Sequence, residues 1–185
     1  MTRALAISRA ARTLRDGGVI AYPTEAVFGL GCLPRRRAAV MRLLAIKRRS
    51  WRKGLILIAA DLTQLAPYVV LPPEPQRGVV LASWPGPHTW ILEARRSTPR
   101  WITGGRPAVA VRVTAHPAAR ELCRRVDDAL VSTSANLNRR PPHRKVLRLR
   151  RDLGRQVDYV LAGELGGAER PTSIRDGRTG QVLRR

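Results

Sequence analysis

Hydroxyl and amide side chains gather where two apolar runs of this sequence end. Residues 19–22 and 130–134 are short and rich in β-branched residues, so both predict buried strands. Polar groups held at the carboxyl ends of buried strands are typical of binding sites in α/β proteins. The side chains at these two ends are Thr24, Glu25, Ser132, Ser134 and Asn136.

Cationic side chains form a second group. Lys47 and Arg49 stand one residue apart, Lys53 precedes an apolar run, and Arg112 interrupts another at residues 108–113. An arginine in so apolar a strand needs an anionic partner, which is either a substrate carboxylate or an internal salt-bridge partner. Lys47 and Arg49 have the alternative interpretation of a solvated helix C-terminus, where positive charge is favoured.

No pattern of a covalent nucleophile or a metal site accompanies these groups. The sequence has no Walker GxxxxGK[ST] element, no HExxH element and no Ser/His/Asp spacing. His88, His116 and His143 are isolated from one another, and we expect them to be structural or exposed. What remains suits a site that gathers an anionic substrate and stabilises charge transfer by positioning.

The elements that must position these groups alternate along the chain. Strands are predicted at 19–22, 54–60, 89–94, 108–113, 130–134, 157–161 and 173–175. Helices are predicted at 3–16, between Pro34 and Lys47, and at 62–68, 76–84, 117–126 and 146–153. Residues 26–31 are predicted to form a glycine-punctuated loop. This alternation predicts one α/β domain with a mostly buried sheet.

The composition is strongly basic, with 35 Lys and Arg against 13 Asp and Glu and a net charge of +22. Such a field attracts polyanions, so RNA, DNA and nucleotides are plausible partners. No apolar run approaches the roughly 18 residues of a membrane helix, and no membrane partner is expected. Cys32 and Cys123 have no metal or redox spacing, which favours a reduced, cytoplasmic protein.

Only three of the 35 cations are lysines, at positions 47, 53 and 145. Abundant arginine is typical of a GC-rich genome, so part of the arginine count reflects codon usage. Lysines that remain then mark positions where a compact ammonium is needed and a planar guanidinium does not serve. This predicts that Lys47→Arg and Lys53→Arg are damaging and that Lys145→Arg is silent.

Six ordered motifs resemble the YrdC-like family of threonylcarbamoyl-AMP synthases. They are AYPTEAVFGLGC, the K-x-R element from Lys47 to Arg49, KGLILIAA, WPGP, AVRVTAHP and LVSTSAN. The resemblance runs in register from about residue 4 to residue 182 and follows the short bacterial form, with a basic end at 177–185. It implies a single YrdC-like domain over residues 1–185, with a twisted open mixed sheet flanked by helices and a basic concave face.

The resemblance also implies a reaction. L-threonine, bicarbonate or CO2, and ATP would give threonylcarbamoyl-AMP and pyrophosphate, for threonylcarbamoyladenosine in tRNA. Mg2+ would accompany the ATP, and other tRNA-modification proteins would be partners. The implied catalytic residues are Lys47 and Arg49; the implied ATP-binding residues are Lys47, Arg49, Lys53, Ser134, Asn136 and Arg175; the implied threonine-binding residues are Thr24, Arg112 and Ser132.

One departure from the family pattern follows the SAN element. The family usually continues with one residue and then Ser-Gly, whereas this chain has Asn138 and Arg139. Arginine adopts a left-handed turn poorly, so we expect a different backbone in this loop, with Arg139 and Arg140 as alternative phosphate contacts.

A second functional class is compatible with the charge. In this interpretation the chain is a double-stranded RNA- or tRNA-binding protein, such as a ribosome or RNA maturation factor, without catalysis. Changing Lys47 separates the two classes, because one cation among 35 contributes little to RNA binding but is essential to the predicted enzyme.

Overall fold

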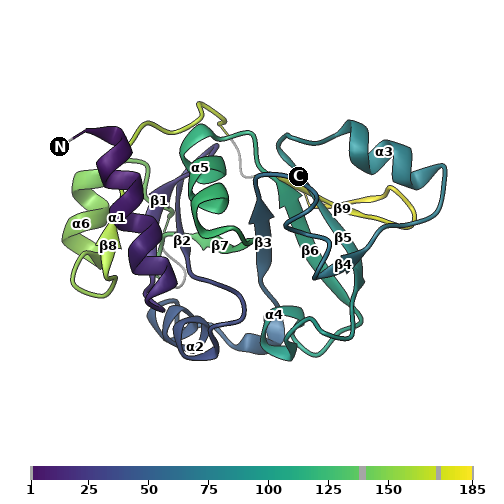
Figure 1. Ribbon diagram of the computed structural model, residues 1–185, viewed down its shortest axis with the longest axis horizontal. Helices are drawn as coiled ribbons and strands as arrows, with labels where there is room; N and C mark the ends of the chain where they lie inside the picture. The colour runs from purple at the N-terminus through teal and green to yellow at the C-terminus, as the bar shows by residue number, and fades with distance from the viewer. Residues whose placement is uncertain (1, 138–140, 170–171, 185) are drawn as a thin grey trace.

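The computed structural model describes residues 2–137, 141–169 and 172–184. Their strands form one mixed sheet in the order β10-β9-β5-β6-β3-β7-β2-β1-β8, with β4 pairing with β5 (Figure 1). The strands are β1 (Ile20–Pro23), β2 (Phe28–Gly31), β3 (Ile56–Ala59), β4 (Val69–Val70), β5 (His88–Ala94), β6 (Ala108–Val113), β7 (Leu130–Ser134), β8 (Tyr159–Val160), β9 (Ser173–Asp176) and β10 (Val182–Arg184). The predicted open mixed α/β sheet is confirmed.

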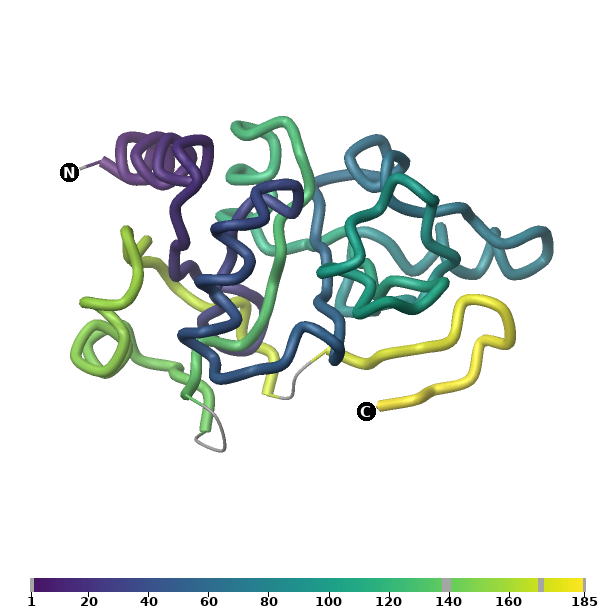
Figure 2. Tube along the Cα trace, turned by 90° about the horizontal axis from the view of Figure 1, so that it is seen from below, coloured from purple at the N-terminus to yellow at the C-terminus, as the bar shows by residue number. Residues whose placement is uncertain are grey.

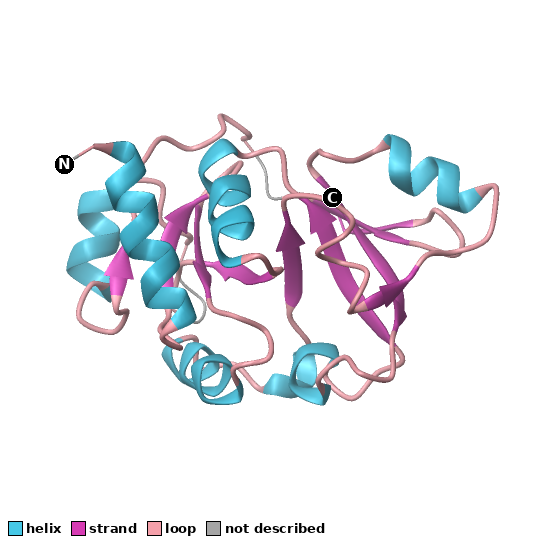
Figure 3. Cartoon of the chain, in the orientation of Figure 1, coloured by secondary structure: helices cyan, strands magenta, loops and turns pink. Residues whose placement is uncertain are grey.

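Helices cover the sheet on both faces, as Figure 3 shows in cyan. One face packs against α1 and α5, and the other packs against α2 and α6. The helices are α1 (Arg3–Arg15), α2 (Arg37–Ile46), α3 (Gln76–Ala82), α4 (Arg100–Thr103), α5 (Pro117–Val126) and α6 (Val146–Leu153), with a 3-10 turn η1 (Trp51–Lys53). Among them, none is long and apolar enough to cross a membrane.

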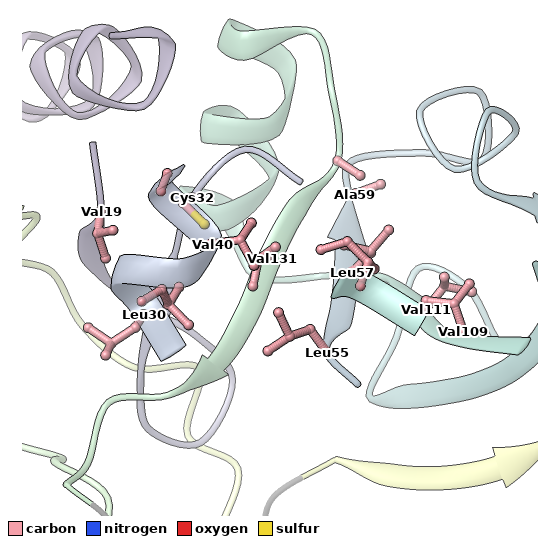
Figure 4. Packing of buried hydrophobic residues seen from close by; sticks show 14 of the residues in the cluster. Val19, Leu30, Cys32, Val40, Leu55, Leu57, Ala59, Val109, Val111 and Val131 are labelled. Carbon is pink, nitrogen blue, oxygen red and sulfur yellow. The ribbon is translucent and has the colours of Figure 1, made fainter. Parts of the chain in front are cut away.

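The alternation of side chains along the strands assigns residues to the two core layers. In β3, Leu57 and Ala59 belong to the layer beneath α2, and the intervening Ile58 belongs to the layer beneath α1 and α5. Figure 4 shows Leu57 beside its register partner Val131 of β7, with Ala59 further along β3. Because both faces are buried, these strands read as continuous apolar runs.

The predicted loop at 26–31 is wrong, because residues 28–31 form strand β2. It pairs antiparallel with β1 across a hairpin whose Thr24 amide donates to the Val27 carbonyl at 3.2 Å. Glycine is depleted in strands, so Gly29 and Gly31 made this strand hard to predict from the sequence. Gly31 is nevertheless required by packing. A Cβ there would lie 2.6 Å from the Val131 carbonyl oxygen. Gly31 thus lets β2 fit between β1 and β7.

The predicted helix at 62–68 is also wrong, because this segment forms successive turns. Asp61 does act as a cap, accepting from the Thr63 hydroxyl at 2.5 Å and the Gln64 amide at 3.3 Å. The Gln64 side chain, however, is buried and bridges the Ala60 amide and the Cys123 carbonyl, each at 2.9 Å. Pro67 then has no amide to continue a helix.

The basic C-terminal end contains a strand that the sequence did not indicate. β10 pairs antiparallel with β9, and β9 pairs in parallel with β5. Figure 2 shows this C-terminal hairpin, in yellow, along the lower edge of the molecule. The hairpin is exposed over residues 182–184, so its sequence carries no apolar alternation to reveal it.

Candidate functional site

A cavity of about 230 Å³ opens where β1 and β7 end. Both strands pair antiparallel with β2, so they run in the same direction and their carboxyl ends meet at one edge of the sheet. The residues lining the cavity are Thr24, Glu25, Ala26, Val27, Gly29, Arg49, Leu55, Ile56, Arg112, Ser132, Thr133, Ser134, Pro142, Thr172 and Arg184. Seven of the sequence-predicted site residues are therefore brought together: Thr24, Arg49, Arg112, Ser132 and Ser134 line the cavity, and Lys47 and Asn136 contact Ser134 from behind the lining.

Thr24 lies in the tight turn between β1 and β2. Its hydroxyl donates to the Val27 carbonyl at 2.6 Å, which fixes the side chain against the turn. The hydroxyl oxygen keeps its acceptor capacity, since a hydroxyl can donate one hydrogen bond and accept others. Thr24 can therefore accept a hydrogen bond from a ligand in the cavity.

Arg112 is 5% exposed and forms a buried ion pair with Glu25, which is 8% exposed. Nη2 of Arg112 lies 3.1 Å from Oε2 of Glu25. Nη1 donates to the hydroxyls of Thr172, at 2.7 Å, and Thr89, at 3.2 Å. The internal salt bridge that the sequence left open is thus present. Arg112 still faces the cavity, and its Nε is buried without a hydrogen-bond partner among the described residues.

Lys47 is the C-cap of α2 but is not solvated, since it is 7% exposed. Its ammonium donates to the Ser134 carbonyl at 2.6 Å, the Asn136 carbonyl at 2.9 Å, and the Asn136 side-chain oxygen. These contacts use all three donors of an ammonium group. Lys47 therefore holds the segment that follows β7, and a planar guanidinium could not reproduce the three bonds.

Arg49 turns into the cavity because Arg48 adopts a left-handed conformation, with φ of 47°. The Arg48 amide donates to the Ala45 carbonyl and the Arg49 amide to the Leu44 carbonyl, which is the Schellman pattern at a helix end. Arg49 Nη2 donates to the Gly54 carbonyl at 3.0 Å, whereas its Nε is buried without a partner in the described chain.

Arg184 is a cavity residue that sequence reasoning missed. It comes from β10, and its Nη2 donates to the Thr172 carbonyl at 3.3 Å. Burial lowers the pKa of Arg49, and the nearby charges of Arg106 and Arg184 lower it further. Arg49 and Arg184 therefore repel each other, and an anion placed between them would relieve that repulsion.

Lys53 and Arg175 are the remaining predicted ATP-binding residues, and like Lys47 and Asn136 they are not part of the cavity lining. Lys53 is exposed at the end of η1. The Arg175 guanidinium carbon lies 5.7 Å from the ring centroid of Trp90, within range of a cation–π interaction. The isolated histidines also lie outside the lining; His116, for example, caps α5 by accepting from the Ala119 amide at 3.4 Å.

Asn138, Arg139 and Arg140, where the sequence departs from the family pattern, lie outside the described residues. The expected change of backbone there stays a prediction. The segment before them is described up to Leu137, and its Asn136 side-chain oxygen accepts from the Ser134 hydroxyl at 2.7 Å.

The cavity does not have the composition of a protein-built Mg2+ site. Such sites use carboxylate and carbonyl oxygens. Glu25 is the carboxylate in the described lining, and it is engaged by Arg112 and by the Thr114 hydroxyl at 2.5 Å. In the part of the chain that the structure describes, no group of three His, Cys, Asp or Glu side chains could hold a metal.

The fold and the cavity together define an α/β domain in which arginines line a cavity at the end of its central strands. A family model for Sua5, YciO and YrdC proteins, described as "Telomere recombination", matches residues 12–185. The chain belongs to this family, as the sequence motifs predicted. It is 56% identical over 184 residues to a protein of Halorhodospira halophila named "Threonylcarbamoyl-AMP synthase", covering all of this chain and 96% of that protein.

Solved structures agree with this assignment. The chain resembles E. coli YciO with a TM-score of 0.85 at 26% identity, covering 99% of this chain and 89% of that one. It resembles P. abyssi Sua5 complexed with L-threonine with a TM-score of 0.86 at 30% identity, covering 92% of this chain. The match spans half of the P. abyssi chain.

Proposed function

We propose that this chain is a threonylcarbamoyl-AMP synthase, a nucleotidyltransferase that uses L-threonine and ATP. The identity to curated synthases over the full chain carries this proposal. The cavity supports it, because one wall presents a buried arginine with hydroxyls and the other presents unpaired arginines. A small amino acid and a polyphosphate need these two kinds of surface.

The cavity size suggests how the two substrates divide the site. Its volume of about 230 Å³ is below the roughly 300–1,000 Å³ that encloses a drug-sized ligand. We therefore place threonine inside, with its carboxylate at Arg112 and its hydroxyl near Thr24 and Ser132. The nucleotide lies across the mouth, with its phosphates toward Arg49 and Arg184.

The third substrate, bicarbonate or CO2, would combine with the threonine amine to form a carbamate. Attack of that carbamate on the α-phosphate, with pyrophosphate leaving, concentrates negative charge at the mouth of the cavity. Arg49 and Arg184 offset this charge, and Lys47 fixes the Ser134–Asn136 segment beside it. Because the described lining has no free carboxylate cluster, Mg2+ would enter on the oxygens of ATP itself.

The test is pyrophosphate release by the purified protein. Release should require threonine, bicarbonate and ATP together, and omission of any one should abolish it. A folded preparation that releases no pyrophosphate with all three substrates present would exclude the proposed function.

We further propose that the basic surface contacts tRNA or double-stranded RNA, and that the protein works in the cytoplasm beside other tRNA-modification proteins. The net charge of +22 supports an RNA contact. For about six phosphate contacts, affinity should fall on the order of 10³-fold between 50 and 200 mM salt. Lys47→Ala should leave that affinity unchanged. Salt-sensitive RNA binding by a folded protein that releases no pyrophosphate would instead favour a non-catalytic RNA-binding role.

A further inference from the structure

Glu25 is buried beside the cavity, yet it is not needed to bind an anionic substrate and would by itself oppose one. Its Oε2 receives Arg112 Nη2 at 3.1 Å, and its Oε1 receives the Thr114 hydroxyl at 2.5 Å. Its backbone carbonyl also receives the Ala168 amide at 2.9 Å. Glu25 is thus fixed by contacts from two segments in addition to Arg112.

The position of the Arg112 guanidinium depends on a fixed partner such as Glu25. An arginine side chain loses much rotamer freedom when it is held in one position, and burial leaves its charge in need of a partner. The carboxylate of Glu25 holds Nη2, and the hydroxyls of Thr89 and Thr172 hold Nη1. Nε remains buried without a partner among the described residues. The two terminal nitrogens of the Arg112 guanidinium are therefore held by the protein, and its Nε–H is a donor with no acceptor among the described residues.

We propose that Glu25 is a positioning residue that holds the Arg112 guanidinium in place for the carboxylate of the amino-acid substrate. This inference rests on the proposed function. Glu25 acts through Arg112, so it raises affinity for the amino acid and does not touch the nucleotide. Holding a donor within a fraction of an ångström of its working position is what makes a binding group effective.

The first measurement is the KM of each substrate in pyrophosphate release, with threonine affinity measured separately by calorimetry. Glu25→Ala should raise the KM for threonine about tenfold or more, because an unanchored charged hydrogen bond loses most of its strength. The KM for ATP should stay within about twofold, since the described side-chain contacts of Glu25 are with Arg112 and Thr114 and not with Arg49 or Arg184. Glu25→Gln keeps an oxygen acceptor for Nη2 and should show a smaller rise, of about threefold.

A matched control uses a second Glu–Arg pair. Glu121 and Arg125 form an ion pair at 2.8 Å on the surface of α5, with side chains 37% and 38% exposed. Glu121→Ala should leave both KM values unchanged.

A double-mutant cycle distinguishes positioning from a general structural role. If Glu25 acts only through Arg112, the threonine affinity of Glu25→Ala/Arg112→Ala should be no lower than that of Arg112→Ala alone. The double variant should also melt at a higher temperature than Arg112→Ala, which leaves the Glu25 charge buried without its partner. Additive losses of threonine affinity, or equal rises in both KM values, would overturn the proposal.

If Glu25→Ala does not fold, Glu25→Gln decides the test, and an unchanged threonine affinity in that variant overturns the positioning role. A further outcome separates this inference from the proposed function. If the wild-type protein binds threonine in the calorimeter but releases no pyrophosphate, the proposed reaction fails while the positioning role is still measured by threonine binding.

Discussion

The two walls of the cavity differ in whether their cations are paired with a carboxylate. On the wall formed by Thr24, Glu25 and Arg112, the cation is buried and neutralised by a carboxylate 3.1 Å away. On the wall formed by Arg49 and Arg184, neither cation forms an ion pair with a described carboxylate, and Arg184 is exposed. Lys47 lies behind the second wall, where it bonds to neutral oxygens.

This difference indicates two modes of recognition. A paired arginine contributes fixed geometry and little net charge, so it selects a ligand by the placement of hydrogen bonds. Arginines without a carboxylate partner contribute a positive electrostatic potential, which attracts a multiply charged anion. Salt screens this attraction. The first suits the carboxylate of an amino acid, and the second suits a triphosphate.

The largest effect is expected at Lys47. Lys47→Ala should lower the rate of pyrophosphate release about 100-fold or more, because it removes three hydrogen bonds that fix the segment after β7. Lys47→Arg should be nearly as damaging, since a planar fork cannot meet the three oxygens. Steady-state kinetics on both variants, with their melting temperatures, provides the measurement.

Neighbouring cations supply the controls for Lys47. Arg48→Gly removes an exposed charge and suits the left-handed φ of 47°, so activity should be unchanged. Lys53→Arg, which the scarcity of lysine predicted to be damaging, should be silent because Lys53 is exposed outside the cavity lining. Equal activity of Lys47→Arg and Lys53→Arg would show that Lys47 does not act through its three bonds.

Arg49→Ala should have the next largest effect and should separate the two walls. We expect the KM for ATP to rise about tenfold or more, with the KM for threonine changed less than about threefold. A rise confined to the KM for threonine would show that the two walls have been assigned to the wrong substrates.

The pH dependence of kcat/KM for ATP should follow the protonation of Lys47, which lies behind the second wall. Burial, and to a lesser extent Arg49, lowers the pKa of Lys47 to about 8. Since the protonated ammonium makes the three bonds, kcat/KM for ATP should fall as pH rises through about 8. The lowered pKa has the opposite effect on stability. The unfolded chain binds more protons between pH 8 and the ordinary value of 10.5, so this group makes the fold more stable as pH rises there.

A pH series of rates and melting temperatures checks this prediction. The rate should decline above pH 8 without a matching decline in melting temperature attributable to Lys47. A rate that stays constant to pH 10 would show that the charged form of Lys47 is not required.

The smallest expected effect is at Arg184. Arg184→Ala should raise the KM for ATP about threefold at 50 mM salt, and the difference from wild type should shrink at 300 mM because an exposed charge is screened. The KM for threonine should change little over the same salt range. A threonine KM as sensitive to salt as the ATP KM would remove the distinction between the walls.

The sequence predicted most of the fold because the buried strands are apolar and the helices have clear ends. The predictions for 108–113, 117–126, 130–134 and 146–153 coincide with β6, α5, β7 and α6. Strands β2 and β10 were missed for different reasons. In β2, glycines needed for close packing have no strand propensity, and β10 is exposed on a hairpin edge.

The sequence by itself determined the family and the types of group at the site, since hydroxyls and cations at the ends of apolar runs can be read from local order. Only the tertiary structure decided how those groups are paired. The contacts Glu25–Arg112 and Lys47–Asn136 join residues 87 and 89 positions apart, and no local pattern encodes them. Arg184 reaches the cavity because β9 pairs with β5, a register set by long-range packing.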